Sequence, residues 1–345
     1  MSARSPHPQR GAALLMAMLT VALVATLASA ALWRQWRGVE VEAAERNRLQ
    51  AHWILSGALD WGRLILRQDA RSGGPDHLAE PWAIPLAEAR LSTFLAASAG
   101  SAATATGGGD AMEAFLTGDI TDLQGRLNAH NLVNNGKVSS AQHIAFQRLF
   151  QLLGLPQAEL NHCIELLQLA LPVGTSSTSS GTATAGLAGS AANDAPIVPT
   201  RFGDLARFGL SESTLARLAP FVTWLPSPHT TVNLNTAPME VLYAIINGID
   251  QAGARKIEQQ RHLTHFVNID EVRTLVAHAS STSDSDGPTI SSQLHGISSR
   301  YFQINGQVRI DQVSLAEQSV VARSGLRVSV RDRQPRAVYA GNPAP

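Results

Sequence analysis

Few side chains in this sequence are spaced for chemistry. His262 and His265 lie three residues apart, so their imidazoles would share one face of a helix, but no cysteine or acidic residue stands at metal-ligand spacing beside them. The run DSDG, from Asp284 to Gly287, begins like a calcium loop and lacks the glutamate that an EF-hand needs at its twelfth position. We interpret the histidines as surface residues and expect no cofactor; a looser calcium site of oxygen ligands is the alternative.

Catalytic motifs are absent from the sequence. It has no Gly-x-Ser-x-Gly, no phosphate-binding glycine loop with lysine, no His-Glu-x-x-His and no convincing pair of acids. The single cysteine, Cys163, can form no intramolecular disulfide and is expected to be buried in a helix. The 27 basic and 27 acidic residues give a formal net charge of zero, and hence no overall field that would attract nucleic acid. We predict that the protein is not an enzyme.

The segment IINGIDQAGARKI resembles a helix-hairpin-helix, with Gly248 and Ile249 in the turn and Ala254 and Ile257 on the packing face. In DNA-binding hairpins a second glycine, two positions after the first, lets backbone N–H groups approach phosphate. Asp250 takes that position here, and its carboxylate would repel phosphate. We therefore expect this hairpin to pack or to contact protein, with no nucleic-acid partner. A membrane-tethered periplasmic hairpin protein that binds DNA is the alternative.

The N-terminal run QRGAALLMAMLTVALVATLASAALWRQW must position everything that follows. It is uncharged from Ala12 to Trp33, and as a helix of roughly 33 Å it would cross a hydrocarbon core of about 30 Å. The small residues from Ala28 to Ala30 are also typical of a signal-peptide cleavage site, which would release a secreted protein. Basic residues flank both ends of the run, so the charge rule does not decide its orientation.

The helical pattern continues after this run, through VEVEAAERNRLQAHWILSGALDWGRLILRQDARSGG. We predict a single helix from about Ala12 to Ala70, whose first half lies in a membrane and whose second half packs against a core. The apolar stripe expected to face that core recurs every three or four residues: Leu49, Trp53, Gly57, Trp61 and Leu64.

The rest of the chain alternates between strand and helix patterns. MEAFLTGDITDLQGRLNAHNLV predicts two strands around a turn at 122–125, and RYFQINGQVRI with SVVARSGLRVSV predicts two or three more. Between them lies a block of short helices punctuated by glycine and proline. Stretches rich in Ala, Ser, Thr and Gly are expected to be loops. The pattern predicts an α+β fold in which a helical block interrupts a sheet.

The junction between Gly11 and Ala12, where a basic leader ends in glycine directly before the apolar run, resembles the prepilin signal of type IV pilins and type II secretion pseudopilins. GDITDLQGRLN, LAPFVTWLPS, VNLNTAP, the hairpin and SSRYFQINGQVRI extend the likeness over most of the chain. Together they resemble the K-type minor pseudopilin of the bacterial type II secretion system.

This resemblance implies a pilin-like fold, in which the long N-terminal helix packs on an antiparallel sheet and a large helical insertion lies between strands. We divide the chain accordingly into a leader (1–11), a transmembrane part (12–33), the helix and first strands of the core (34–128), the insertion (129–285) with a low-complexity loop (172–196), the C-terminal strands (286–333) and a disordered tail (334–345).

The resemblance also implies a route and a role. Prepilin peptidase would cut after Gly11 and methylate Ala12, leaving a single-pass inner-membrane protein with most of its chain in the periplasm. Major subunits carry glutamate at mature position five, where this chain has Met16, and an apolar residue there is the pattern of the K subunit. The implied partners are the I and J minor pseudopilins, the pseudopilus and the inner-membrane platform. The acidic run with which related chains bind calcium is missing, so calcium is not carried over.

Overall fold

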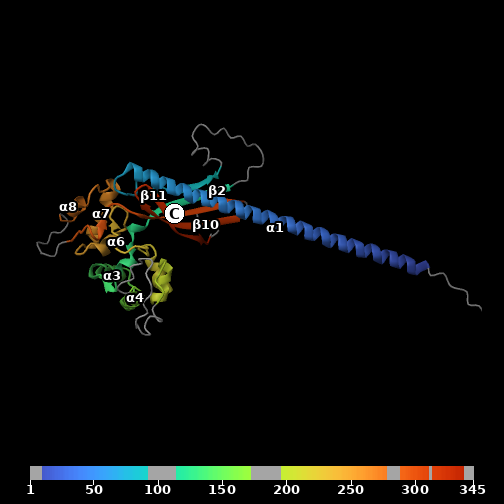
Figure 1. The fold of residues 1–345 in the computed structure, drawn as a ribbon, viewed down its shortest axis with the longest axis horizontal. Helices are drawn as coiled ribbons and strands as arrows, with labels where there is room; N and C mark the ends of the chain where they lie inside the picture. The colour runs from blue at the N-terminus through green and yellow to red at the C-terminus, as the bar shows by residue number, and fades with distance from the viewer. Residues whose placement is uncertain (1–9, 92–113, 172–195, 278–287, 311–312, 338–345) are drawn as a thin grey trace, which may run out of the picture.

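The computed structural model describes residues 10–91, 114–171, 196–277, 288–310 and 313–337. Its first element is the helix α1 (Arg10–Ser72), which has 63 residues and a length of roughly 95 Å. No proline interrupts this run, and Gly73 and Gly74, both with positive φ, end it. The N-terminal part of α1 projects far beyond the rest of the molecule (Figure 1). The predicted single long helix is confirmed.

The C-terminal part of α1 packs on a five-stranded antiparallel sheet. In β9, alternate residues such as Ile304 and Val308 are buried while Gln307 and Arg309 are exposed, the alternation expected of a sheet with one covered face. The predicted α+β fold is therefore confirmed. In spatial order the strands are β1 (Leu86–Arg90), β2 (Ala114–Asp122), β9 (Tyr301–Ile310), β10 (Val313–Ser324) and β11 (Arg327–Arg336).

Two glycines allow α1 to approach the sheet closely. A Cβ added at Gly62 of α1 would lie 2.9 Å from Cγ2 of Ile304, and one added at Gly306 of β9 would lie 2.8 Å from Cδ1 of Leu55. Because neither glycine carries a side chain, the larger residues around them interlock, and Leu59 is buried between helix and sheet. Burial of each such leucine stabilises the fold by about 1.5–3 kcal/mol.

Between β2 and β9 the chain leaves the sheet and forms the helical insertion, which lies beyond the end of α1 that is remote from its projecting part (Figure 1). Its helices are α3 (Ser140–Leu152), α4 (Gln157–Ala170), α5 (Glu212–Leu218), α6 (Met239–Ile245), α7 (Gln251–Leu263) and α8 (Ile269–Ala277). Its short strands are β3 (Leu127–Asn128), β4 (Val133–Asn134), β5 (Lys137–Val138), β6 (Val222–Thr223), β7 (Val232–Asn233) and β8 (His295–Gly296). The 3-10 helix η3 (Leu123–Gly125) leads from β2 into the insertion, whereas η1 (Pro81–Ala83) lies outside it, between α1 and β1.

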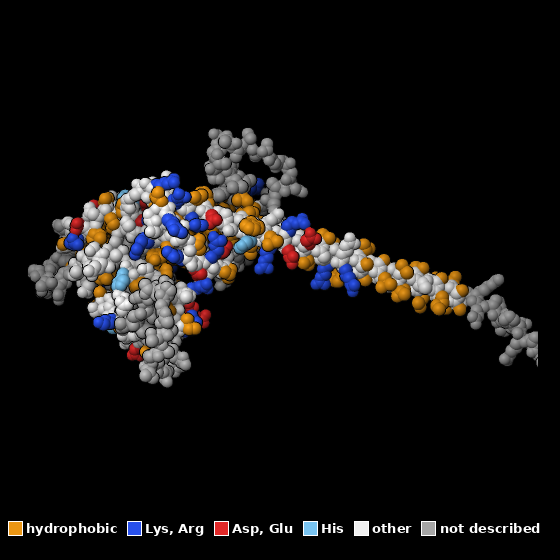
Figure 2. Space-filling model, in the orientation of Figure 1, with side chains coloured by type: hydrophobic (Ala, Val, Ile, Leu, Met, Phe, Trp, Pro, Cys, Tyr) orange, Lys and Arg blue, Asp and Glu red, His pale blue; other side chains and the backbone are white. Residues whose placement is uncertain are grey.

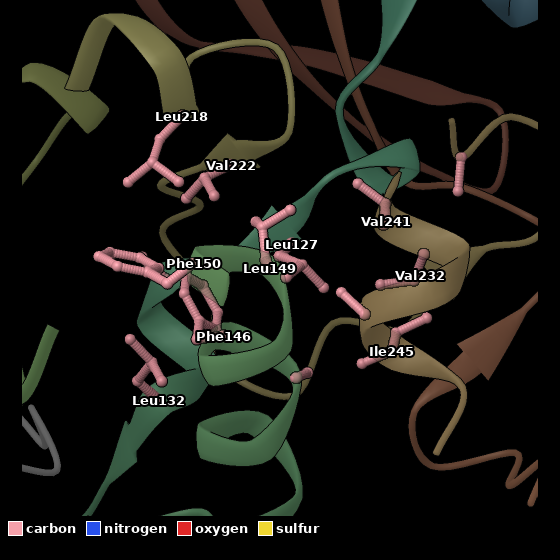
Figure 3. Close-up of a cluster of buried hydrophobic side chains, with 14 of the residues drawn as sticks. Leu127, Leu132, Phe146, Leu149, Phe150, Leu218, Val222, Val232, Val241 and Ile245 are labelled. Carbon is pink, nitrogen blue, oxygen red and sulfur yellow. The ribbon is translucent and has the colours of Figure 1, made fainter. Parts of the chain in front are cut away.

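The insertion has its own hydrophobic core. Phe146, Leu149 and Phe150 of α3 recur at helical spacing and point into it, so α3 acts as its central helix (Figure 3). Cys163 of α4 is buried in the same core, as the sequence predicts. Other members shown in Figure 3 are Leu127, Leu132, Leu218, Val222, Val232, Val241 and Ile245.

The strand expectation for residues 114–132 needs correction. β2 ends at Asp122, whose carboxylate accepts a hydrogen bond of 2.8 Å from the Gln124 N–H and starts η3. The following strand β3 pairs in parallel with β6 instead of returning to β2. The turn residues at 122–125 therefore lead the chain out of the sheet.

The boundary that we placed at the C-terminus also changes. β11 continues to Arg336, beyond the predicted boundary at 333, because its residues up to Arg336 pair with β10. The predicted loop at 95–110, residues 172–195 of the predicted loop 172–196, and residues 338–345 of the predicted tail lie outside the described residues.

Candidate interaction surfaces

The N-terminal part of α1 is long and apolar enough to cross a membrane. From Ala12 to Trp36 every side chain is exposed, and apolar atoms cover the projecting rod (Figure 2). Trp33 and Trp36 end this region beside Arg34 and Arg37, which is the composition of a membrane-water interface. The arrangement fits a single-pass anchor that continues into the folded region without a break.

The predicted processing residues lie at the start of this helix. Gly11 and Ala12 both belong to its first turns, and Met16 is exposed on its surface. Cleavage after Gly11 and methylation of Ala12 remain predictions.

The apolar stripe predicted on the second half of α1 exists, but the expectation that it packs against this chain's core was wrong. Leu49, Trp53 and Leu64 are 62, 74 and 56% exposed. A different set of residues covers the sheet, on the opposite side of the helix. We call Ala51, Leu55, Leu59, Gly62 and Leu66 the inner stripe, and Leu49, Trp53, Gly57 and Leu64 the free stripe. Trp61, the remaining residue of the predicted stripe, lies at the edge of the free stripe and is 37% exposed.

A glycine in each stripe shows how the two faces differ. Glycine inside a helix costs about 0.5–1 kcal/mol relative to alanine. At Gly62 the packing of this chain explains why glycine is needed, since an added Cβ would meet Ile304 of the sheet. At Gly57 nothing lies within 4 Å of the added Cβ. Gly57 thus leaves a notch between Trp53 and Trp61, one turn away on either side, that no described residue of this chain fills.

The predicted hairpin joins α6 to α7. Gly248 adopts a φ of 82°, which only glycine takes without strain, and Ile249, Ala254 and Ile257 are buried. The Asp250 carboxylate accepts a hydrogen bond of 2.7 Å from the Gly253 N–H at the start of α7. A negative charge therefore already occupies the helix end at which a phosphate would bind.

Sequence reasoning missed the residue that fixes this hairpin. Arg148 of α3 donates hydrogen bonds to the carbonyl oxygens of Ile246 (2.8 Å) and Ile249 (2.5 Å), and its guanidinium lies 4.4 Å from the ring centre of Tyr243. It lies about 100 positions before the hairpin in the sequence, so no local pattern signals the contact. With its turn carbonyls bound in this way, the hairpin is a packed part of the insertion.

A charged cluster lies where α1 ends. Asp69, Asp76 and Glu80 place carboxylate oxygens within 4.8 Å of one another. Arg323 of β10 donates to Asp69 Oδ2 and Asp76 Oδ2, each at 2.6 Å, and its guanidinium lies 4.8 Å from the ring centre of Phe302. Because this arginine supplies the positive charge, the cluster joins α1 to the sheet and does not have the open carboxylates of a metal site.

Glu80 titrates unusually in this cluster. Burial raises the pKa of Glu80 to about 7, and the neighbouring Asp69 carboxyl adds to the rise, against hydrogen bonds from the His77 N–H and Trp82 Nε1. Glu80 therefore holds a proton at mildly acidic pH.

A stacked imidazole pair links the same loop to the insertion. The rings of His77 and His265 lie 3.7 Å apart and nearly parallel. His265 is therefore half-buried in this stack, whereas His262 is exposed, as predicted for a surface residue. Burial lowers the pKa of His77, and the neighbouring His265 lowers it further. Both effects favour the neutral ring in this stack. The DSDG run, Asp284 to Gly287, lies outside the described residues.

A buried hydrogen-bond network holds the insertion on the sheet. The Asp122 carboxylate at the end of β2 accepts from Thr236 Oγ1 (2.6 Å), Ser299 Oγ (2.6 Å) and Asn233 Nδ2 (3.0 Å). Asn233 and Thr236 come from the interior of the insertion, at and just after β7, and Ser299 comes from its C-terminal end, just before β9. Burial raises the pKa of Asp122, and the hydrogen bonds from Ser299, Thr236 and the Gln124 N–H oppose this rise.

Comparison with known proteins places these features in a family. Family models described as "Type II secretion system (T2SS), protein K" match residues 125–227 and 232–292. Both segments fall within the helical insertion, and the second contains the hairpin.

Curated relatives extend the match to the whole chain. The type II secretion system protein K of Pseudomonas aeruginosa is 27% identical over 92% of this chain and 89% of its own length. The protein K of Pectobacterium carotovorum subsp. carotovorum is 23% identical over 97% of this chain and 99% of its own length. The protein K of Klebsiella pneumoniae is 42% identical over 22% of this chain and 24% of its own length.

The fold is shared with a solved structure. A chain in the crystal structure of the GspK–GspI–GspJ complex from the enterotoxigenic Escherichia coli type 2 secretion system superposes with a TM-score of 0.54, covering 86% of this chain and 99% of that chain. The two sequences are 15% identical, so the likeness is one of fold.

Proposed function

We propose that this chain, which belongs to the type II secretion system protein K family, is a minor pseudopilin that lies at the tip of the pseudopilus and assists protein export across the outer membrane. It would be held in the inner membrane by α1, with its sheet and insertion in the periplasm. Its expected contacts are the I- and J-type minor pseudopilins, the inner-membrane platform and, during maturation, prepilin peptidase.

The observation that carries this proposal is the free stripe. It continues the membrane anchor along the same helix, so a partner anchored in the same membrane would bring its own helix alongside. Trp53 is 74% exposed, and no described residue outside the helix comes within 4 Å of a Cβ added at Gly57, which suits a second helix packed closely across them. The related K chain forms a complex with I and J chains, which supports partners of that kind here.

Two features favour the tip position. Met16 replaces the acidic residue that would pair with a neighbour's N-terminal amine, so this chain lacks the group expected of a subunit inside the filament. The helical insertion lies at the end opposite the anchor, where it would hinder another subunit from stacking (Figure 1).

Partner assembly can be tested on the free stripe. We expect the full-length variant with Leu49→Ala, Trp53→Ala and Leu64→Ala to lose co-purification with the I- and J-type minor pseudopilins and to fail to restore secretion in a host that lacks protein K. The matched control is Ile144→Ala, an exposed apolar residue on α3. Assembly and secretion that survive the triple substitution would contradict the proposal.

Maturation and position need separate measurements. The mass of the mature N-terminal peptide from host membranes should show N-methylated Ala12; a chain that starts at Ala31 would be a released periplasmic protein, and an intact Met1 would be a plain anchor. Met16→Glu should allow incorporation along filaments, and unchanged tip placement would remove this residue from the argument.

A further inference from the structure

An apolar cleft of about 260 Å³ lies beside α1, between the helix, η1 and the first strands of the sheet. Its walls come from parts of the chain that are distant in sequence, so it exists only in the folded molecule. The larger side chains that line it are Trp61, Ile65, Trp82, Ile84, Ile120 and Ile304.

The walls of the cleft are fixed. Trp82 donates a hydrogen bond of 2.7 Å to Glu80 and meets Phe302 edge to face at 5.3 Å between ring centres. On the opposite wall, Gly62 is in contact range of Ile304, so the helix cannot move closer to the sheet and close the gap. The space is therefore part of the packed architecture.

The rim of the cleft is apolar and open. Ile84 is 67% exposed on one side, and Trp61, at the edge of the free stripe, is 37% exposed on the other. The carboxylate in the lining, Asp119, already accepts from Asn305 Nδ2 at 2.7 Å and Thr121 Oγ1 at 3.2 Å. An occupant would therefore gain mainly by burying apolar surface.

The size of the cleft limits what it can hold. Sites for small molecules usually enclose about 300–1,000 Å³, which is more than this cleft offers. One large side chain is the better match, and large buried anchors of this kind carry much of the energy of protein interfaces. Trp61 lies at the edge of the free stripe and also lines the cleft, so a helix lying on the free stripe would pass directly beside the opening.

We propose that this cleft receives one large apolar side chain, aromatic or aliphatic, from the helix of the anchored minor pseudopilin that packs on the free stripe. This inference rests on the proposed function and adds to it the point of insertion. The cleft acts as the hole, and the partner helix supplies the knob, which fixes the register between the two helices.

The test fills the cleft from inside. Ala58 of α1 lines the cleft, and we expect Ala58→Phe in the full-length chain in detergent to lower the affinity for the I- or J-type partner about tenfold or more. Ile144→Phe, which places the same side chain on an exposed position of the insertion, should bind like the unmodified protein. If Ala58→Phe lowers the unfolding temperature, Ile84→Ala replaces it, with an expected loss of about threefold or more because only one rim is removed.

The outcomes separate the two proposals. Unchanged affinity for both cleft variants, with affinity lost in the triple variant of the free stripe, would overturn the cleft proposal and leave the proposed function intact. Unchanged affinity in all of these variants would overturn both.

A photo-crosslinker at position 84 identifies the occupant directly. Crosslinks to the periplasmic helix of the I- or J-type partner are expected. Crosslinks only to a second copy of this chain, or only within the chain itself, would overturn the proposal.

Discussion

The two stripes of α1 have similar apolar composition but differ in how far their side chains are buried. The inner stripe, with Leu55 and Leu59, is covered by the sheet of the same chain, whereas the free stripe, with the larger Trp53, stays largely exposed among the described residues. The difference teaches that size and hydrophobicity do not decide which face of a helix enters its own core. A face enters the core where the facing surface has a complementary shape. Here Gly62 and Gly306 provide it, because without side chains they let the helix and the sheet approach closely.

The largest expected effect comes from replacing one leucine of the inner stripe. Leu59→Ala should lower the free energy of unfolding by about 2–5 kcal/mol, because Leu59 is buried and its removal leaves a cavity. Trp53→Ala on the free stripe should change it by less than about 0.5 kcal/mol. Urea unfolding of the full-length chain in detergent measures both, and equal destabilisation would break the comparison.

Replacing the two helix glycines, Gly62 and Gly57, by alanine should change the stability of the protein in opposite directions. Gly62→Ala should destabilise the protein by about 1–3 kcal/mol, because the added methyl overlaps Ile304. Gly57→Ala should stabilise it by about 0.5–1 kcal/mol, because its Cβ meets open space and alanine favours helix. We expect the same Gly57→Ala change to weaken partner assembly by filling the notch. Destabilisation by Gly57→Ala would show that the notch has a contact within this chain.

We expect a pH dependence on the side of α1 that faces the sheet, where the helix meets the charged cluster. The pKa of Glu80 is about 7 in the folded protein, above its ordinary value of 4.5, so the folded state holds a proton that the unfolded state has released. The stabilisation from this proton is complete below about pH 4.5 and is lost as pH rises through about 7. Glu80→Gln should flatten this part of the stability profile, because an amide cannot ionise. An unaltered profile would show that another group titrates there.

The smallest effect is expected on the exposed surface of α1 near the membrane. Glu42 and Arg46 form a salt bridge of 3.0 Å between largely exposed side chains. Glu42→Ala should therefore cost less than about 0.5 kcal/mol. A larger loss in the assembled complex than in the isolated chain would extend the partner interface toward the membrane.

Local patterns were enough for several elements. The uncharged run and the helical spacing after it predicted α1, and the alternation in RYFQINGQVRI predicted β9. Both predictions were possible because helix and strand periodicities are visible in consecutive residues. The hairpin around Gly248 was recognisable for the same reason. The pairing of β3 with β6 was not, since it joins Leu127 to Val222 across the insertion.

Contacts that hold the candidate surfaces together escaped sequence reasoning for a physical reason. Arg148 reaches the hairpin from another helix, and Arg323 reaches Asp69 and Asp76 from the far end of the chain. The members of such a contact stand at no characteristic spacing in the sequence, because only the fold brings them within hydrogen-bond distance.

The sequence by itself determined that this protein has a long helix with an apolar anchor, a sheet interrupted by helices, and a further apolar stripe of Leu49, Trp53, Gly57, Trp61 and Leu64. Only the tertiary structure decided that this stripe faces outward and that a cleft opens beside it. Helical periodicity records which side chains share a face, but the surface that covers the face is built by strands elsewhere in the chain.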